Sequence, residues 1–254
     1  MRAYLAFTKK EILESWRTYK LLIIVMVFLF LGMLGPLTAK ITPQLLELLM
    51  TEGIQISVAE PTALDSWAQF FKNVSQMGFI IIAIIFSGMM ANEYNKGTLI
   101  NMLTKGLPRR IVILSKFTVA TLIWTIGYLL CFGLSYAYTA YFWNTDGVLN
   151  LLMAVFFLWL FGLLFIATIL LGGTLFKSSY GSLLFIAGFI GVLFTLNIIP
   201  GLKKFNPIAL SQESMSLLMG STDVRELVFP MVICIIVVIF FILIAIKIFN
   251  KKQI

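Results

Sequence analysis

Residues 92–116 read NEYNKGTLINMLTKGLPRRIVILSK, a polar and basic stretch set between two long apolar runs. The runs, residues 74–91 and 117–143, are long enough to cross a hydrocarbon core about 30 Å thick. Five of the chain's 19 Lys and Arg residues fall in the polar stretch, against a single acid, Glu93. The pattern therefore predicts a loop between two membrane spans.

Short loops rich in Lys and Arg stay on the cytoplasmic side of a membrane, so we expect this loop to face the cytoplasm. Its middle part carries apolar residues between Thr98 and Thr104, and Gly106 and Pro108 follow as helix-stop signals. Such a pattern is typical of a short helix lying along the membrane surface. The charges by themselves are also explained by a basic loop that only fixes the topology.

The composition excludes a water-soluble domain. The chain is 60% hydrophobic and 12% charged with a mean hydropathy of +1.00, whereas soluble domains keep roughly a quarter of their residues charged. A net charge of +8 is compatible with nucleic-acid binding. However, most of the cations fall in segments expected inside the cell and most of the acids in segments expected outside. This distribution indicates positive-inside bias in a multi-pass membrane protein.

The hydropathy pattern predicts an all-α membrane protein, a single transmembrane domain over residues 1–254 with its N- and C-termini cytoplasmic. We also expect an N-terminal amphipathic elbow helix at residues 1–20, although a simple cationic anchor before the first span fits the same residues. The Gly35-Pro36 pair is expected to end the first span, and a short amphipathic outer helix follows it. The six expected transmembrane helices are residues 21–37, 74–91, 117–143, 149–176, 183–199 and 228–246.

Residues 200–226, between the fifth and sixth spans, are too polar to cross the membrane. Asn206 is expected to cap a helix with Pro207 in its first turn, and Gly220 to stop it. The apolar residues of this expected outer helix are Leu210, Met215 and Leu218. In the fifth span, Ala187 and Gly191 form a small-xxx-small pair that would let another helix approach closely, which makes them a candidate dimer seam.

Several kinds of chemistry are absent from the sequence. There is no histidine, no P-loop for binding ATP phosphates, and no charged residue within the six expected spans. The two cysteines, Cys131 and Cys234, both fall inside apolar spans, which argues against a disulfide framework. We therefore expect no catalytic residue, no bound cofactor and no metal site, and an energy source outside this chain.

The order of residues in the cytoplasmic loop resembles the signature of the permeases of ABC-2 type transporters. Glu93 is followed by Gly-Thr-Leu at 97–99, Leu-Thr at 103–104, Pro-Arg-Arg at 108–110 and the Lys116 that opens the next span. The resemblance implies that residues 93–110 form a coupling helix that docks on a separate ATP-binding subunit. The residues expected to couple to that ATPase are Glu93, Lys96, Gly97, Thr98, Leu99, Pro108, Arg109 and Arg110.

The resemblance also implies how the loop works and what surrounds it. Glu93 is expected to pair with a cation of the ATPase, or with Arg109 or Arg110, and Thr98 to cap the coupling helix. Two permeases, identical or related, would combine with two ATPase subunits that carry ATP and Mg. The short outer helices at 200–226 would help to close the outer end of the pathway.

Within this family, the chain resembles the small permeases of peptide and antibiotic export or self-immunity systems. The expected function is therefore ATP-driven export of an amphipathic or hydrophobic substrate, such as a peptide, antibiotic or lipid, across or out of a bacterial plasma membrane. A competing hypothesis from a different class is a membrane anchor or sensor that recruits a cytoplasmic ATPase or signalling partner without translocating anything. The sequence alone leaves both open.

Overall fold

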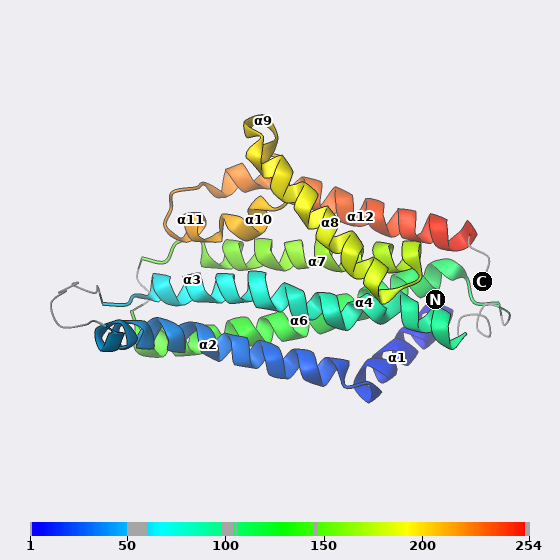
Figure 1. Ribbon diagram of the computed structural model, residues 1–254, viewed down its shortest axis with the longest axis horizontal. Helices are drawn as coiled ribbons and strands as arrows, with labels where there is room; N and C mark the ends of the chain where they lie inside the picture. The colour runs from blue at the N-terminus through cyan, green and yellow to red at the C-terminus, as the bar shows by residue number, and fades with distance from the viewer. Residues whose placement is uncertain (1, 50–59, 98–103, 105, 145–146, 252–254) are drawn as a thin grey trace.

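The computed structural model describes residues 2–49, 60–97, 104, 106–144 and 147–251, and most of its helices run along one long axis (Figure 1). These residues contain no strand. This confirms the predicted all-α class with six candidate membrane-spanning helices. The six helices that are long and apolar enough to span a membrane are Lys20–Gln44, Ala63–Asn95, Arg109–Phe142, Leu151–Phe176, Ser179–Ile198 and Val224–Lys251.

The last three of these helices begin and end within a few residues of the expected spans, whereas the first three are longer than expected. The first described helix and the last turn of the chain's final helix lie at the same end of the bundle (Figure 1). The long helices are α1 (Arg2–Arg17), α2 (Lys20–Leu49), α3 (Ala63–Asn73), α4 (Phe79–Lys96), α6 (Arg109–Phe142), α7 (Leu151–Phe176), α8 (Ser179–Ile198) and α12 (Val228–Lys251). The short ones are η1 (Val74–Gly78), α9 (Pro200–Lys203), α10 (Ala209–Gln212), α11 (Ser214–Leu218) and η2 (Val224–Leu227).

Helix α7 forms the centre of the bundle. It packs against α4, α6, α8 and α12, and most of its side chains are buried. Two aromatic side chains of α6 fix its position: Trp124 Nε1 donates to the carbonyl of Trp159 at 3.2 Å, and Tyr128 OH donates to the carbonyl of Val155 at 2.8 Å. Helices α8 and α12 instead expose most of their apolar side chains, as helices that face lipid or a partner subunit do.

Helix α2 does not end at the Gly35-Pro36 pair, which corrects the expected boundary of the first span. It continues through Pro36 to Leu49, and the separate outer helix expected after it is the end of α2. Proline has no N–H, so the carbonyl of Gly32, one turn earlier, loses its usual helical partner. That carbonyl accepts a hydrogen bond from Ser135 Oγ of α6 at 2.9 Å. The helix persists through its proline because a distant helix satisfies the freed carbonyl.

The second span also begins earlier than the expected residue 74. Helices α3, η1 and α4 follow one another without a break, and η1 is a π-helical turn inside the span. A π-helical turn holds one more residue than an α-helical turn. The extra residue rotates α4 about its axis relative to α3, so the two helices can pack with different neighbours. Helix α3 packs on α2 and α6, whereas α4 packs on α7 and α8.

Helix α6 begins at Arg109 rather than at residue 117, because Val112 and Ile113 are buried in the core and extend the helix backwards. The connection between α4 and α6 is correspondingly short. The extra length of the first three helices brings in charged residues that lie outside the expected spans, among them Lys40, Asp65, Lys72, Glu93 and Lys116.

Candidate functional site

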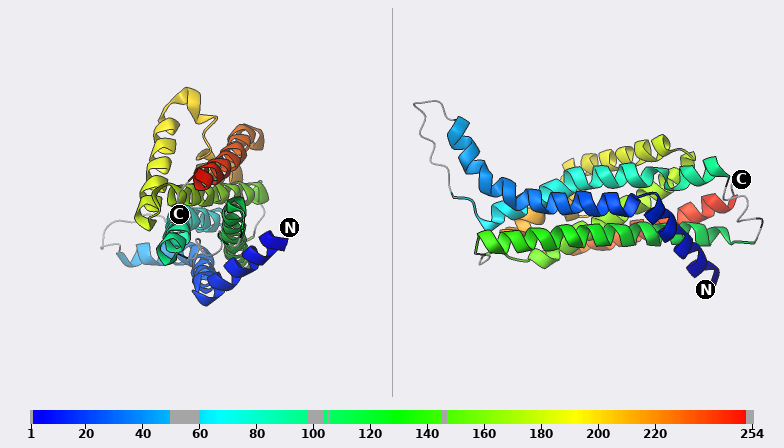
Figure 2. Two further views of the ribbon diagram at one scale, coloured as in Figure 1. Left: turned by 90° about the vertical axis from the view of Figure 1, so that its right-hand side faces the viewer. Right: turned by 90° about the horizontal axis from the view of Figure 1, so that it is seen from below.

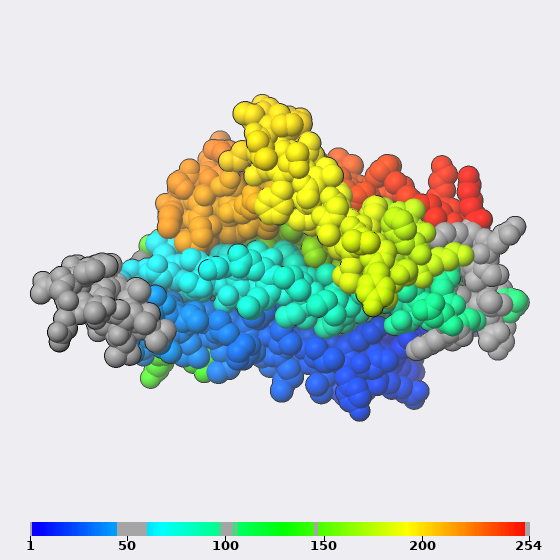
Figure 3. All heavy atoms as spheres, in the orientation of Figure 1, coloured from blue at the N-terminus to red at the C-terminus, as the bar shows by residue number. Residues whose placement is uncertain are grey.

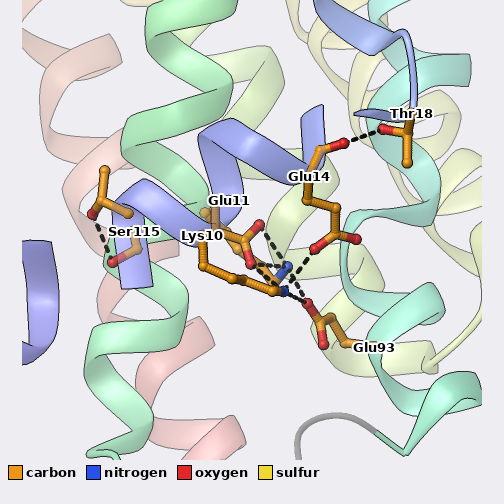
Figure 4. Close-up of polar contacts among 8 residues, drawn as sticks. Lys10, Glu11, Glu14, Thr18, Glu93 and Ser115 are labelled. Atoms are coloured by element: carbon orange, nitrogen blue, oxygen red, sulfur yellow. Dashed lines mark hydrogen bonds and ion pairs between the residues drawn. The ribbon is translucent and has the colours of Figure 1, made fainter. Parts of the chain in front are cut away.

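Five charged residues meet where α1 crosses the last turn of α4 and the first turns of α6 (Figure 4). We call this group the charge cluster: Lys10, Glu11 and Glu14 from α1, Glu93 from α4 and Lys116 from α6. Lys116 Nζ lies 2.9 Å from a carboxylate oxygen of Glu11 and 3.0 Å from one of Glu93. Lys10 Nζ lies 2.6 Å from Glu93, 2.7 Å from Glu14 and 3.0 Å from Glu11.

The central members of the charge cluster are almost completely buried. Lys116 is 2% exposed, Glu93 3% and Glu11 6%. A buried charge is costly unless it is paired, and removing one partner leaves the other uncompensated. Because the three residues belong to three different helices, the cluster holds α1 in place against α4 and α6.

The sequence of α1 places its cluster residues on one face of the helix. Lys10 and Glu14 are four residues apart and Glu11 and Glu14 are three apart, so their side chains are neighbours on the helix surface. Two hydroxyl pairs extend the same contact along α6: Tyr4 OH lies 2.8 Å from Thr118 Oγ1, and Thr8 Oγ1 donates to Ser115 Oγ at 3.1 Å.

The ion pairs in α1 outweigh the effect of burial on its titratable groups. Partial burial lowers the pKa of Lys10, but its hydrogen bonds to Glu14 and Glu93 raise that pKa above the ordinary value. Partial burial raises the pKa of Glu14, but the hydrogen bond and charge of Lys10 bring it below the ordinary value. The pair Lys10 and Glu14 is therefore charged throughout the neutral pH range.

The cluster also contains the group of described residues that could ligate a metal ion. Carboxylate oxygens of Glu11, Glu14 and Glu93 lie within 4.8 Å of one another. The ammonium groups of Lys10 and Lys116 already lie against these carboxylates and form ion pairs with all three of them. The arrangement is that of a structural ion cluster.

A second group of contacts joins the same end of α6 to the last turn of α12. Arg109 Nη1 donates to the carbonyl of Phe249 at 2.7 Å and to that of Asn250 at 3.2 Å. The ring of Phe249 also contacts Tyr94 at the end of α4, with ring centroids 6.3 Å apart, and Lys177 Nζ lies 5.4 Å from the Tyr94 ring centroid. Residues from α4, α6 and α12 thus meet beside the connection between α4 and α6.

The structure shows where several of the residues expected to couple to an ATPase lie, and the position of Glu93 differs from expectation. Glu93 points into the protein and pairs with Lys10 and Lys116, rather than reaching outward to a partner. Gly97 is the C-cap of α4, and its φ of 63° is a value that glycine adopts easily. Pro108 precedes α6, and Arg110 in the first turn of α6 is exposed.

The middle of the expected coupling helix, residues 98–103 with Thr98 and Leu99, lies outside the described residues, as does the side chain of Lys96. Its two ends are described. One is the end of α4, next to Glu93, and the other is the start of α6, two turns before Lys116. Both ends of the loop are therefore joined to α1 through the charge cluster.

An apolar groove of about 850 Å³ lies between α4, α7 and α8. In the view of Figure 3, α8 (yellow) stands out from the bundle above α4 (cyan). Ala187 and Gly191, the expected dimer-seam pair, line this groove and are exposed. Polar residues line it at the junction of η1 and α10: Ser75, Gln76, Ser211 and Gln212.

The segment between α8 and α12 folds into short helices, as expected, and packs back onto the bundle. Asn206 Oδ1 accepts from the backbone N–H of Ile208 at 3.1 Å, and Asn206 Nδ2 donates to the carbonyl of Leu193 in α8 at 2.6 Å. Pro207 precedes α10, Leu210 and Leu218 are buried, and Met215 is half-buried. A break at Glu213 divides the expected single helix into α10 and α11.

Reasoning from the sequence missed the charge cluster. The sequence predicts Lys10, Glu11 and Glu14 only as charges of an N-terminal amphipathic helix, and Lys116 only as a basic residue that opens the third span. Two signals were available: the acids of residues 1–20 lie three residues apart on one face, and Lys116 is followed at once by an apolar run that would bury it. Neither signal identifies the partner, because Glu11 and Lys116 are 105 residues apart.

Comparison with known proteins gives the class of this chain. Residues 13–194 match the family model described as "ABC-2 family transporter protein", which is more than half of the sequence, and the chain belongs to this family. It is similar to the "Uncharacterized transmembrane protein YxlG" of Bacillus subtilis (strain 168), at 24% identity over 181 residues, 70% of each chain. The protein is thus a multi-pass membrane protein and the membrane component of an ABC transporter. Members of the family normally work with an ATP-binding subunit.

Proposed function

We propose that this chain is the permease subunit of an ATP-driven exporter, energised by two copies of a separate ATP-binding subunit that carries ATP and Mg. The observation that carries the proposal is the charge cluster. It connects both ends of the loop at 97–108 to a third element, α1, through Glu93 and Lys116. A force applied to this loop by an ATPase would therefore move α1, α4 and α6 together.

In this proposal the end of the bundle that carries α1 and the last turn of α12 faces the cytoplasm. The exposed Arg110 presents a cation beside the loop, and Arg109 is held by the carbonyl groups at the end of α12. We assign Arg110 to contact with the ATPase and Arg109 to positioning the start of α6. Glu93 acts from inside the protein by holding Lys10 and Lys116.

The pathway for cargo would lie along the groove between α4 and α8, with a second permease, identical or related, on its open side. The groove is apolar along most of its length and has polar residues at one end, which suits an amphipathic or hydrophobic cargo such as a peptide, antibiotic or lipid. Ala187 and Gly191 would allow close approach of the second permease. The segment from Asn206 to Leu218 would close the outer end of the pathway.

Transport would follow from a shift between two states of the permease pair. ATP binding closes the ATPase dimer, and a permease conformation that fits the closed dimer better becomes more populated. The helices that must move are α4 and α6, because the loop joins them. Helix α1 follows because its ion pairs with both helices are buried.

The test is affinity purification of the full chain from its native membranes in mild detergent. We expect the wild type to bring down an ATP-binding protein and the Arg110→Glu variant to lose it, because the substitution reverses an exposed charge beside the loop. The matched control is Arg225→Glu, which reverses an exposed charge in η2, between α11 and α12. Absence of any nucleotide-binding partner from the wild type would overturn the proposal. A stable ATPase complex that moves no cargo would favour an anchor or sensor instead.

A further inference from the structure

Helix α1 has two faces of unlike chemistry, and the polar one points into the protein. Its contacts with the bundle include hydrogen bonds and ion pairs made by Tyr4, Thr8, Lys10, Glu11 and Glu14. The same side of α1 also buries one apolar side chain, Phe7, in the core. Apart from Phe7, this is the reverse of the arrangement in a soluble protein, where a surface helix buries its apolar stripe and exposes its polar one.

The opposite face of α1 is apolar and points away from the protein. Leu5 is 63% exposed and Trp16 is 70% exposed, and Ile12 and Leu13 between them are also exposed. An apolar helical face that no other described residue covers requires a non-aqueous environment, and the boundary between headgroups and acyl chains provides one. The outward face of α1 is therefore suited to lie against lipid.

The charges of α1 are divided between the two faces in the same way. Both of its acids, Glu11 and Glu14, point inward and form ion pairs with Lys10 and Lys116. Three cations, Arg2, Lys9 and Arg17, are exposed, and none of them forms an ion pair with another described residue. The face that meets lipid thus carries positive charge and no acid.

A cavity lies at the elbow where α1 turns into α2. Figure 2 shows α1 leaving the line of α2 at an angle, and Tyr19 at the turn has a positive φ of 59°. The cavity measures about 370 Å³, within the range of small-molecule sites of about 300–1,000 Å³. Its walls are apolar and aromatic: Trp16, Tyr19, Leu21, Leu22, Val25 and Met26. Arg17 follows Trp16 in the last turn of α1.

We propose that this elbow cavity is a binding site for an anionic phospholipid, with an acyl chain against Trp16 and Met26 and the phosphate against the guanidinium of Arg17. Arginine suits this role because its planar fork of donors matches the oxygens of a phosphate group. The aromatic rings of Trp16 and Tyr19 suit the headgroup level of a bilayer. The bound lipid would cover the apolar face of α1 and keep the helix at the depth at which the charge cluster forms.

Trp16 provides a direct readout, because the other four tryptophans are buried or half-buried. The full chain is reconstituted in vesicles that contain equal mole fractions of either dibrominated phosphatidylglycerol or dibrominated phosphatidylcholine. Bromine quenches a tryptophan that it touches, and the difference between the wild type and Trp16→Phe isolates the Trp16 signal. One cation at a membrane surface favours an anionic lipid by about fivefold. We therefore expect the site beside Trp16 to have an apparent affinity for brominated phosphatidylglycerol that is about fivefold higher than for brominated phosphatidylcholine. This ratio of affinities is the quantity compared between variants.

The Arg17→Gln variant is expected to bring this ratio close to one while its emission from the other tryptophans is unchanged. Lys251→Gln, which removes an exposed cation from the last turn of α12 at the same end of the bundle, is expected to keep the full ratio. Equal quenching of the wild type by both lipids would overturn the proposal, and so would an unchanged ratio in Arg17→Gln. Absence of quenching by either lipid would show that protein covers the elbow. None of these outcomes depends on whether an ATPase binds to the loop.

Discussion

Lys116 is the residue on which the contacts of the charge cluster converge. It is buried, and its ammonium group bonds to carboxylates from two other helices, those of Glu11 and Glu93. The coupling proposed for this protein depends on that geometry. A loop can move three helices together only if the residue that joins them stays buried and keeps its ion pairs.

At this scale we expect Lys116→Met to destabilise the protein by about 3–5 kcal/mol, because two buried carboxylates lose a partner. The matched control is Lys72→Met, which removes an exposed lysine of another span that forms no ion pair with a described residue. Unfolding of the purified chain by SDS, followed by tryptophan fluorescence, measures both. Adding Glu93→Gln to Lys116→Met should restore part of the loss, since one uncompensated charge disappears. Equal midpoints for the two single variants would contradict this role of Lys116.

At the scale of the element, the π-helical turn η1 decides how the second span is used. The part of the span before it, α3, packs on α2 and α6, and the part after it, α4, packs on α7 and α8 and ends beside Glu93. One extra residue in the turn gives α4 a rotational setting of its own. The position of Glu93 opposite Lys116 therefore depends on a feature that lies more than four turns away along the same helix.

Deletion of Ser75 should convert η1 into a regular α-helix and rotate α4 by about 100° relative to α3. Glu93 would then face away from Lys116, and we expect little folded protein to remain in the membrane. Ser75→Ala keeps the length of the turn and is the matched control. The Ser75 hydroxyl has no hydrogen-bond partner in the described structure, so this variant should accumulate normally. Size-exclusion chromatography of detergent-solubilised chain compares the two, and a deletion variant that elutes like the wild type would argue against the register role of η1.

At the scale of the whole molecule, six spans place the loop between α4 and α6 and the segment between α8 and α12 on opposite sides of the membrane. The buried centre of the bundle is α7, while α8 and α12 expose apolar side chains to lipid or to a second permease. We expect the orientation to follow from charge, because short loops rich in Lys and Arg are retained in the cytoplasm.

Thiol labelling tests this orientation with little background, because both native cysteines, Cys131 and Cys234, are fully buried. We expect a membrane-impermeant maleimide to label Ser221→Cys in intact cells, since Ser221 is exposed between α11 and α12. The exposed Thr104→Cys, in the loop between α4 and α6, should react only after the membrane is permeabilised. Labelling of both variants in intact cells would refute the six-span arrangement with cytoplasmic termini.

The sequence by itself determined the class of this protein. A run of about 20 apolar residues is enough to identify a span, because the hydrocarbon core sets the length and excludes unpaired backbone groups. The six spans, the all-α class and the membership of the ABC-2 family all follow from such local signals. The short helices near Asn206 were also recognisable, because a cap and a proline act within a few residues of the helix that they start.

Only the tertiary structure decided where the spans end and which charges meet. Pro36 reads as a stop signal until Ser135, 103 residues later, is seen to bond to the carbonyl of Gly32. Glu93 reads as a residue that faces a partner until Lys10 and Lys116 are seen to enclose it. In both cases the deciding atom belongs to a distant helix. The cost of a freed carbonyl or a buried charge depends on what packs against it, and no local pattern contains that information.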